Sequence, residues 1–336
     1  MSLDVKVKID LVKPIGRSGF GIPLILEESA TSTKNYTECS NLAEVVSAGF
    51  NTTSKTYKVA NTIFMQDNAP DKIAVCATSE ATATWLGDVA NVGRNWRQLV
   101  VVTNSSDTPI SVSGIMSKIE TLDNKLYFAD LEVDDSTSLT VTGINRTILF
   151  YCDSSTEYPS PAAALVGATA GLPAGSITYK NMILKGISPQ NITDTEINAI
   201  HTKGGITFVT KAGDNVTTEG KVAGGEYIDI IDAKDYIVSN LEYQTQKLLN
   251  SSSKIPYDNN GIAQLQSICE NVLKDAYNNG IIASTDDGSP DYSVNYALRQ
   301  QTSESDRAAR KYVGGQFSFK LQGAVHSVNI TGEIII

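Results

Sequence analysis

The chain has 336 residues, of which 41% are hydrophobic and 19% charged, and its formal net charge is −10. This composition is typical of a globular protein, and the length allows about two or three domains. The negative charge disfavours non-specific binding to nucleic acid or anionic membrane. No apolar run approaches the roughly 18 to 20 residues of a membrane span, so we expect no direct membrane insertion.

The start of the chain lacks the basic residues and apolar stretch of a signal peptide, so we expect synthesis and folding in the cytoplasm. The cysteines are far apart in the sequence, which favours neither a zinc site nor a dense disulfide framework. We expect reduced and mostly buried thiols at these positions. They are Cys39, Cys76, Cys152 and Cys269.

Residues 3–11, "LDVKVKIDL", alternate strictly between apolar and charged side chains. This period of two predicts a strand of roughly 30 Å with one buried face. The chain also ends on an apolar stretch, "GEIII", which needs to be buried by something. Both ends therefore look like strands that need a sheet.

Helices and strands are expected to alternate after the first strand and its glycine-rich turn, "GRSGFG". We expect Ser40 to be the N-cap of a helix that stops at Gly49. A second helix around residues 59–64 leads to the buried strand "KIAVCAT" at 72–78.

Further helices are expected at 85–93, 111–122 and 160–171, and strands at 98–103, 125–130 and 146–151. Pro161 lies at a favoured early position of the third of these helices. This alternation predicts an α/β fold, mixed with α+β elements, in which helices flank a partly parallel sheet.

The last third changes character. A strand with a turn is expected at 205–217, followed by two helices, the second ending at Gly280, and then by strands. The apolar residues change from odd positions, up to Leu321, to even positions, from Val328, which indicates a bulge or corner near Gly323. We predict an N-terminal arm (1–20), an α/β domain (21–200), a second, α+β C-terminal domain (201–322) and a C-terminal arm (323–336).

A search for catalytic chemistry finds none. His201 and His326 have no partners in a recognisable catalytic motif, and "GRSGFG" lacks the order of a phosphate-binding loop. The carboxylate pairs, such as Asp286 and Asp287, lie in polar loops typical of solvated turns. We therefore predict no catalytic, cofactor-binding or metal site. The terminal strands either pair with their own domain's sheet or add to the sheets of neighbouring copies.

Several segments resemble the tail sheath proteins of contractile phage tails and of phage-tail-like, R-type bacteriocins, above all their short sheath-like members. The resemblance covers most of the chain and is mainly one of pattern over residues 95–190. It is carried by "VKIDLVKPIGRSGFGIPLIL", by residues 36–75, by "KIPYDNNGIAQLQSICENVLKDAYNNGIIA" and by "RAARKYVGGQFSFKLQGAVHSVNITGEI". Within the last segment, "GAVHSVNITG" is the most specific part.

The resemblance implies a non-enzymatic structural subunit that forms stacked hexameric rings around an inner tube and contracts to drive the tube through a cell envelope. It implies no cofactor, and it implies self-association, a tail tube protein, baseplate and terminator proteins as partners, with no nucleic acid. It also implies a protein made in the bacterial cytoplasm that becomes part of a released particle.

The same resemblance implies that the two arms link each subunit to its neighbours. The candidate linking residues are Leu3, Val5, Val7, Ile9, Leu11, Val325, Val328, Ile330, Ile334 and Ile335. Arg307, Arg310 and Lys311 form a basic group in an acidic protein, and we expect them to contact the tube or a neighbour.

Two alternatives stay open. The first is a soluble, hydrolase-like α/β enzyme whose terminal strands pair with its own sheet; a pocket with clustered, pKa-shifted groups would favour it. The second is a secreted, glycan-bearing adhesin, suggested by the N-x-S/T triplets of the chain and weakened by the missing signal peptide.

Overall fold

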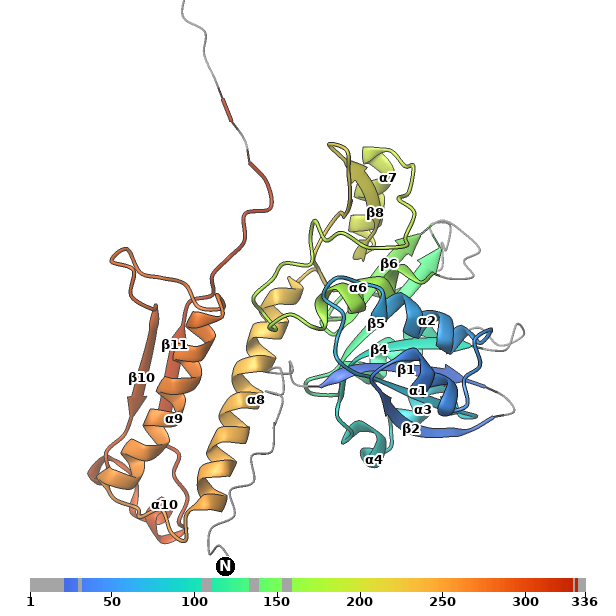
Figure 1. The fold of residues 1–336 in the computed structure, drawn as a ribbon. Coiled ribbons are helices and arrows are strands. Elements are labelled where there is room, and N and C mark those ends of the chain that lie inside the picture. Colours follow the sequence, from blue (N-terminus) through green and yellow to red (C-terminus); the bar gives the residue numbers. More distant parts are fainter. Residues whose placement is uncertain are drawn as a thin grey trace, which may run out of the picture.

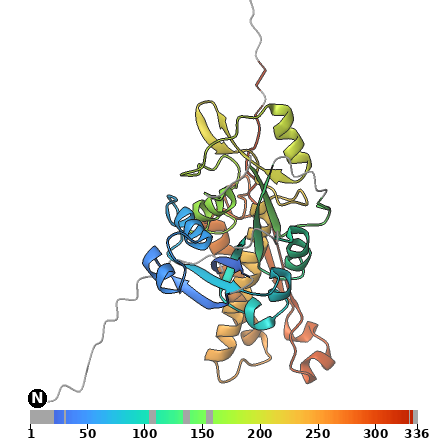
Figure 2. The ribbon, with the colours of Figure 1, turned by 90° about the vertical axis from the view of Figure 1, so that its right-hand side faces the viewer.

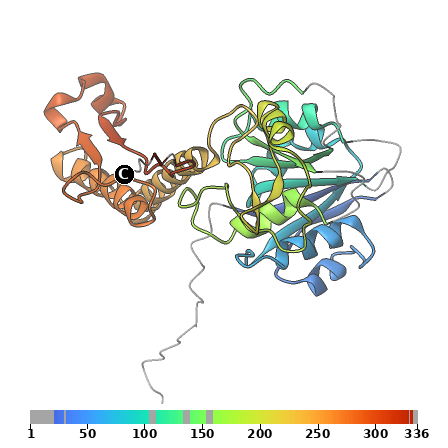
Figure 3. The same ribbon diagram turned by 90° about the horizontal axis from the view of Figure 1, so that it is seen from above.

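A computed structural model describes residues 21–29, 32–103, 110–132, 139–152, 159–328 and 330–331. The expected strand at Leu3–Leu11 and the terminal Ile334 and Ile335 lie outside the described residues. The described chain forms two packed regions, an α/β region and a smaller C-terminal region, and the long helix α8 (Ile228–Ser251) lies between them (Figures 1 and 3).

The α/β region is built on a seven-stranded sheet with the order β2-β3-β1-β4-β5-β6-β7. The edge strand β2 is antiparallel to β3, and every other neighbouring pair is parallel. The sheet therefore has the mixed, mostly parallel character that the alternating sequence predicts. Its strands are β1 (Ile22–Glu28), β2 (Lys34–Cys39), β3 (Ile73–Thr78), β4 (Trp96–Thr103), β5 (Leu126–Glu132), β6 (Thr147–Cys152) and β7 (Gly205–Ile206).

Helices cover both faces of this sheet (Figure 2). One face packs on α1 (Leu42–Ser47), α2 (Lys55–Phe64) and α6 (Pro161–Thr169). The other packs on α3 (Thr82–Trp85), α5 (Val112–Ile119) and α7 (Asp194–Thr202). Successive strand residues alternate between the two cores, which is why β3 and β6 are buried along their whole length.

Helix α6 is buried on all sides. It begins with Pro161 after the N-cap Ser160, whose hydroxyl accepts a hydrogen bond from the Ala163 N–H. It packs closely on α2 at Gly167. A Cβ atom at this position would lie 2.5 Å from the carbonyl oxygen of Ile63. A larger side chain at position 167 would force the two helices apart.

The C-terminal region packs α8 and α9 (Asn259–Asn278) against a two-stranded antiparallel sheet of β10 (Tyr292–Tyr296) and β11 (Gly315–Phe319). Helix α9 ends before Gly280, which has a positive φ of 76°. Arg299–Gln301 form a 3-10 turn and Glu304–Ala308 form the short helix α10 between the two strands. A hairpin of β8 (Phe208–Lys211) and β9 (Asp214–Thr217) lies beside the main sheet.

Several sequence-based expectations need correction. The N-cap of α1 is Asn41, not Ser40, because the Asn41 side chain accepts the hydrogen bond from the Glu44 N–H. The helix expected at 85–93 is two short helices, α3 and α4 (Val89–Val92), which a turn at Gly87 separates. His326, expected within a strand, lies in an extended segment without strand pairing.

The division between the two domains stays a prediction. The main sheet continues past residue 200, because β7 pairs with β6 at Leu149–Gly205 and Phe150–Ile206. We therefore propose a boundary at the start of α8, near residue 228, instead of at 200–201.

Candidate assembly surface

The sheet of β10 and β11 has two edges on which the described residues place no further strand. Lys320 N–H donates to Asp291 O at 3.0 Å, and Ala297 N–H donates to Gly314 O at 3.0 Å. The residue pairs 291–320 and 297–314 are therefore hydrogen-bonded pairs of the ladder. In an antiparallel ladder every second pair is of this kind. The main-chain groups of Gly315, Phe317 and Phe319 consequently point away from β10.

Alternate side chains of this sheet lie on its two opposite faces. Tyr292, Val294, Tyr296 and Phe319 pack against the core that α8 and α9 form. Ser293 and Ser318, on the other face, have hydroxyl oxygens 2.8 Å apart.

Phe317 lies on the apolar face but is 40% exposed, so that core does not fully cover the β11 side. An isolated two-stranded sheet is only marginally stable, and an open edge beside an uncovered aromatic ring is a ready site for an added strand.

The C-terminal segment is the most exposed apolar part of the described chain. It leaves β11, passes α8 and extends away from both packed regions (Figures 1 and 2). The side chains of Val325, Val328 and Ile330 are 81%, 71% and 90% exposed. The structure therefore brings these three linking candidates into one solvent-exposed segment, and they bury little apolar surface on their own subunit.

A buried group of charges holds α8 against the main sheet. The Arg97 guanidinium, at the start of β4, donates from Nη1 to Asp235 Oδ2 at 2.9 Å and from Nη2 to Asp232 Oδ1. Its Nη1 also donates to the side-chain oxygen of Asn124 at 2.6 Å. All three charged side chains are buried. Because a buried charge is costly unless paired, this geometry fixes the register of α8 on the sheet.

Arg146 and Tyr179 complete this buried group, and we call Arg97, Arg146, Tyr179, Asp232 and Asp235 together the charged joint. Arg146 donates to both carboxylate oxygens of Asp235, and the Tyr179 hydroxyl donates to Asp232 Oδ2 at 2.7 Å. Burial raises the pKa of Tyr179, and the neighbouring Asp232 raises it further. Tyr179 therefore remains a neutral hydrogen-bond donor. Sequence reasoning did not identify any of these residues.

The basic group expected to contact the tube or a neighbour is divided in the structure. Arg307 Nη1 donates to the carbonyl oxygens of Arg299 and Thr302, so this side chain stabilises its own loop. Arg310 and Lys311 are exposed. These two remain available to a partner.

The histidines have structural contacts. His201 Nε2 is 2.9 Å from the Thr218 hydroxyl oxygen, and His326 Nε2 is 3.0 Å from the Thr178 hydroxyl oxygen. Within the described ranges, no His, Cys, Asp and Glu side chains gather in groups of three that could hold a metal ion. The four cysteines are free and buried, as expected. None of the helices in the described chain has the length and apolar character needed to cross a bilayer.

Residues 228–334, which contain α8, α9, β10 and β11, match the sequence model of a family described as "E217 tail sheath protein gp31-like, C-terminal domain". No curated protein matches the chain.

Solved structures are similar over a longer stretch. The anti-feeding prophage helical sheath in its contracted state gives a TM-score of 0.71 at 13% identity, and the alignment covers 99% of each chain. The contracted PVC sheath of an extracellular contractile injection system gives 0.69 at 12% identity, covering 99% of this chain and 98% of that one. The sheath tail protein Lin1278 from Listeria innocua gives 0.57 at 11% identity, covering 82% and 88%. The resemblance to the contractile tail sheath family is thereby confirmed, in sequence over residues 228–334 and in fold over nearly the whole chain.

Proposed function

We propose that the chain is the structural subunit of a contractile tail sheath. It polymerises as stacked hexameric rings around an inner tube and contracts to drive the tube through a target cell envelope. The observation that carries this proposal is the match of residues 228–334 to a tail sheath C-terminal domain, on a chain that aligns over 99% of its length with solved sheath structures.

Strand addition is the physical basis of the lattice. The outward main-chain groups of β11 can pair with an arm of another copy, and each hydrogen bond contributes roughly 0.5 to 1.5 kcal/mol net. The apolar side chains of that arm, spaced two residues apart, would cover the half-exposed ring of Phe317. Main-chain pairing makes few demands on side chains, so it survives a change of angle between subunits.

The arms proposed for this role are residues 3–11 and 324–336. Val325, Val328 and Ile330 are exposed on their own subunit, which supports burial against a neighbour. The energy of contraction is then the difference between two packings of the lattice, and no nucleotide is required.

The proposal extends to partners and location. The sheath subunit associates with itself, with an inner tube protein, with a baseplate and with a terminator, and it acts without catalysis, cofactor or nucleic acid. It is made in the bacterial cytoplasm and becomes part of a released phage tail or tail-like particle. The similar solved chains include two from structures of the anti-feeding prophage baseplate, one of them in its contracted state, which supports baseplate association.

The test compares apolar-to-acid changes at exposed positions inside and outside the arm. Val328→Asp with Ile330→Asp places charges in the arm, and Val89→Asp places one at an equally exposed valine of α4, 84% exposed, far from the arm in sequence. We expect all variants to keep the circular dichroism of the wild type, because none of these side chains is buried. Negative-stain imaging should show hollow cylinders for the wild type and for Val89→Asp, and only single particles for the arm variant.

Other outcomes favour other functions. Compact wild-type particles at every concentration would favour the enzyme alternative, as would a saturable hydrolase activity lost on one polar-to-Ala change. An arm variant that unfolds would mean that the segment belongs to the core of its own domain.

A further inference from the structure

We propose that His326 is a positioning residue for the C-terminal arm: it anchors the arm to the α/β region of its own subunit and so fixes where the free arm begins. The inference rests on the proposed function in so far as the arm reaches a neighbouring copy. The anchoring contact itself lies within one chain and can be measured without a polymer.

The anchor is visible in the burial pattern of the segment. Among the described residues from Leu321 to Thr331, every one is exposed except His326. Its side chain is only 15% exposed. An otherwise solvated segment thus inserts one side chain into the body of the protein.

The receiving site is made by the α/β region and the start of α8. His326 Nε2 lies 3.0 Å from the Thr178 hydroxyl oxygen, and Nδ1 lies 3.6 Å from Glu219 Oε1. The ring meets Tyr227 edge to face, with 4.9 Å between centroids. Both imidazole nitrogens therefore face polar groups of the α/β region, and the ring packs on an aromatic side chain.

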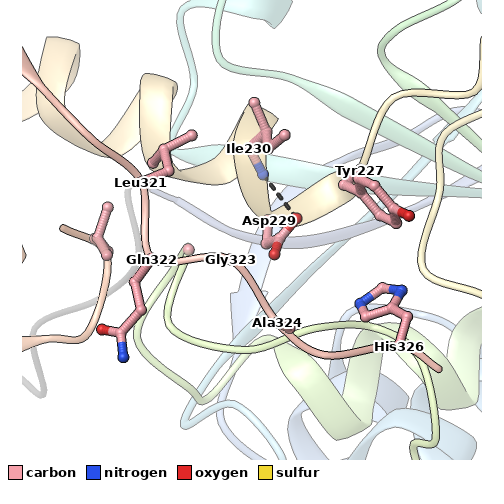
Figure 4. Close-up of a pocket in the computed structure, with 10 residues that line it drawn as sticks. Tyr227, Asp229, Ile230, Leu321, Gln322, Gly323, Ala324 and His326 are labelled. Atoms are coloured by element: carbon pink, nitrogen blue, oxygen red, sulfur yellow. Dashed lines mark hydrogen bonds between the residues drawn. The ribbon is translucent and has the colours of Figure 1, made fainter. Parts of the chain in front are cut away.

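The same segment lines one side of an open cavity between the two packed regions. The cavity has a volume of about 240 Å³ and is lined by Asp229 and Ile230 of α8, by Ile281, by residues 321–324 and by His326 (Figure 4). The segment leaves the C-terminal region at Gln322, whose N–H donates to Ile281 O at 2.9 Å. It thus crosses from one region to the other before His326 attaches it.

The position of the anchor sets the free length of the arm. With His326 docked, the free arm begins at residue 327. If His326 is released, it begins at Gly323, which adds four residues and at most about 14 Å of extended chain. Because the effective concentration of a tethered segment falls as its tether lengthens, release should raise the critical concentration for polymer formation by about a factor of two or more.

The first measurement uses spin labels at Ser327→Cys and Asn61→Cys, two exposed positions, with the labelled chain diluted in unlabelled protein. The native cysteines are buried, so labelling is selective. We expect a narrow distance distribution for the wild-type background, a broad one for His326→Ala and an intermediate one for Thr178→Val. His201→Ala is the matched control, because that imidazole also contacts a threonine hydroxyl but not the arm, and it should leave the distribution narrow.

The second measurement compares assembly of His326→Ala with that of a wild-type chain carrying a four-residue Gly-Ser insertion after Ser327. The insertion lengthens the free arm equally but leaves the anchor docked. Both variants should assemble at a raised critical concentration, and only His326→Ala should show the broad distance distribution.

A distribution that stays narrow in His326→Ala, or that is already broad in the wild type, overturns the anchor. A released arm that assembles like the wild type overturns its positioning role and leaves the proposed function intact. A wild-type chain that forms no polymer contradicts the proposed function and, with it, the linking role of the anchored arm.

Discussion

The carboxylate of Asp235, on α8, accepts hydrogen bonds from both terminal nitrogens of Arg146, at 2.9 and 3.0 Å. Arg146 immediately precedes β6, so this pair joins the helix that leads into the C-terminal region to the central sheet. Arg97 contacts the same carboxylate from the start of β4 at 2.9 Å. The orientation of α8 therefore depends on a buried acid between two arginines, one on β4 and one just before β6, on either side of β5.

Asp235→Ala should destabilise the protein strongly, because it leaves Arg97 and Arg146 without this acid. Removing one partner of a buried ion pair typically costs roughly 3 to 5 kcal/mol. The measurement is the free energy of unfolding from urea denaturation. Asp67→Ala is the control, because its ion pair with Lys185 is exposed and should be worth at most about 1 kcal/mol. Equal losses for the two variants would show that the buried pair does not support α8.

The same carboxylate should make stability depend on pH in the acid range. Burial alone would raise the pKa of Asp235, but hydrogen bonds from Arg146 and the charges of both arginines outweigh burial and lower it. A carboxyl whose folded pKa lies below its unfolded value of about 3.9 stabilises the fold fully above that value. The stabilisation is lost as the pH falls from there through the folded pKa.

This pH dependence is measured as the difference in unfolding free energy between the wild type and Asp235→Asn. We expect a constant difference from pH 7 down to about 5 and a decrease below about 4. A difference that stays constant to pH 2, or that grows on acidification, would contradict the assignment.

Much of the α/β region was predictable because its signals are local. The mostly apolar segments at 73–78 and 147–152 are long enough only for buried strands, and Ser160 with Pro161 marks the start of α6 in the sequence. The spacing of apolar residues in α9 and Gly280 after it likewise gave that helix and its end. The N-cap of α1 was placed one residue too early, at Ser40 instead of Asn41, because serine and asparagine are both favoured at this position.

The charged joint was not predictable in the same way, because its partners are far apart in the chain. Arg97 and Asp235 are separated by 138 residues, and only the fold brings them together. One signal was available: Asp232 and Asp235, three residues apart, share a face of α8 with the buried Ile228. Acids on an apolar helix face predict buried basic partners without identifying them. The open edge of β11 was equally hidden, because strand pairing depends on the fold.

The exposed members of the basic group should matter only in the assembly. Arg310→Glu with Lys311→Glu should leave the unfolding free energy within about 0.5 kcal/mol of the wild type, because both side chains are exposed. On an acidic tube or neighbour, each lost pair is worth roughly 0 to 1 kcal/mol, which a helical array multiplies. Sedimentation should therefore show weaker sheath assembly on the tube and a reduced salt dependence.

Lys254→Glu with Lys274→Glu changes the net charge equally at exposed sites elsewhere in the C-terminal region and is the control. Assembly that is unchanged in the Arg310 and Lys311 variant, or weakened equally in the control, would refute a specific contact. Arg307 is unsuitable for this test, because its replacement also removes donors to the carbonyl oxygens of Arg299 and Thr302.

The open edge of β11 can be tested with one residue and two substitutions. The N–H of Phe317 points away from β10, since the hydrogen-bonded pairs of the ladder are those of its neighbours Gln316 and Ser318. Phe317→Ala removes the half-exposed ring and keeps this donor, whereas Phe317→Pro removes both. Because proline is tolerated where an edge N–H has no partner in its own sheet, neither variant should unfold the monomer. Phe317→Ala should weaken polymer formation through lost apolar burial, and Phe317→Pro should abolish it by breaking the added ladder as well. Circular dichroism checks the fold, and electron microscopy checks whether cylinders form.

If Phe317→Pro assembles as well as Phe317→Ala, the main chain of β11 does not pair with an arm. If Phe317→Pro unfolds the monomer, the Phe317 N–H already has a partner within the subunit, and strand addition must occur at the edge of β10.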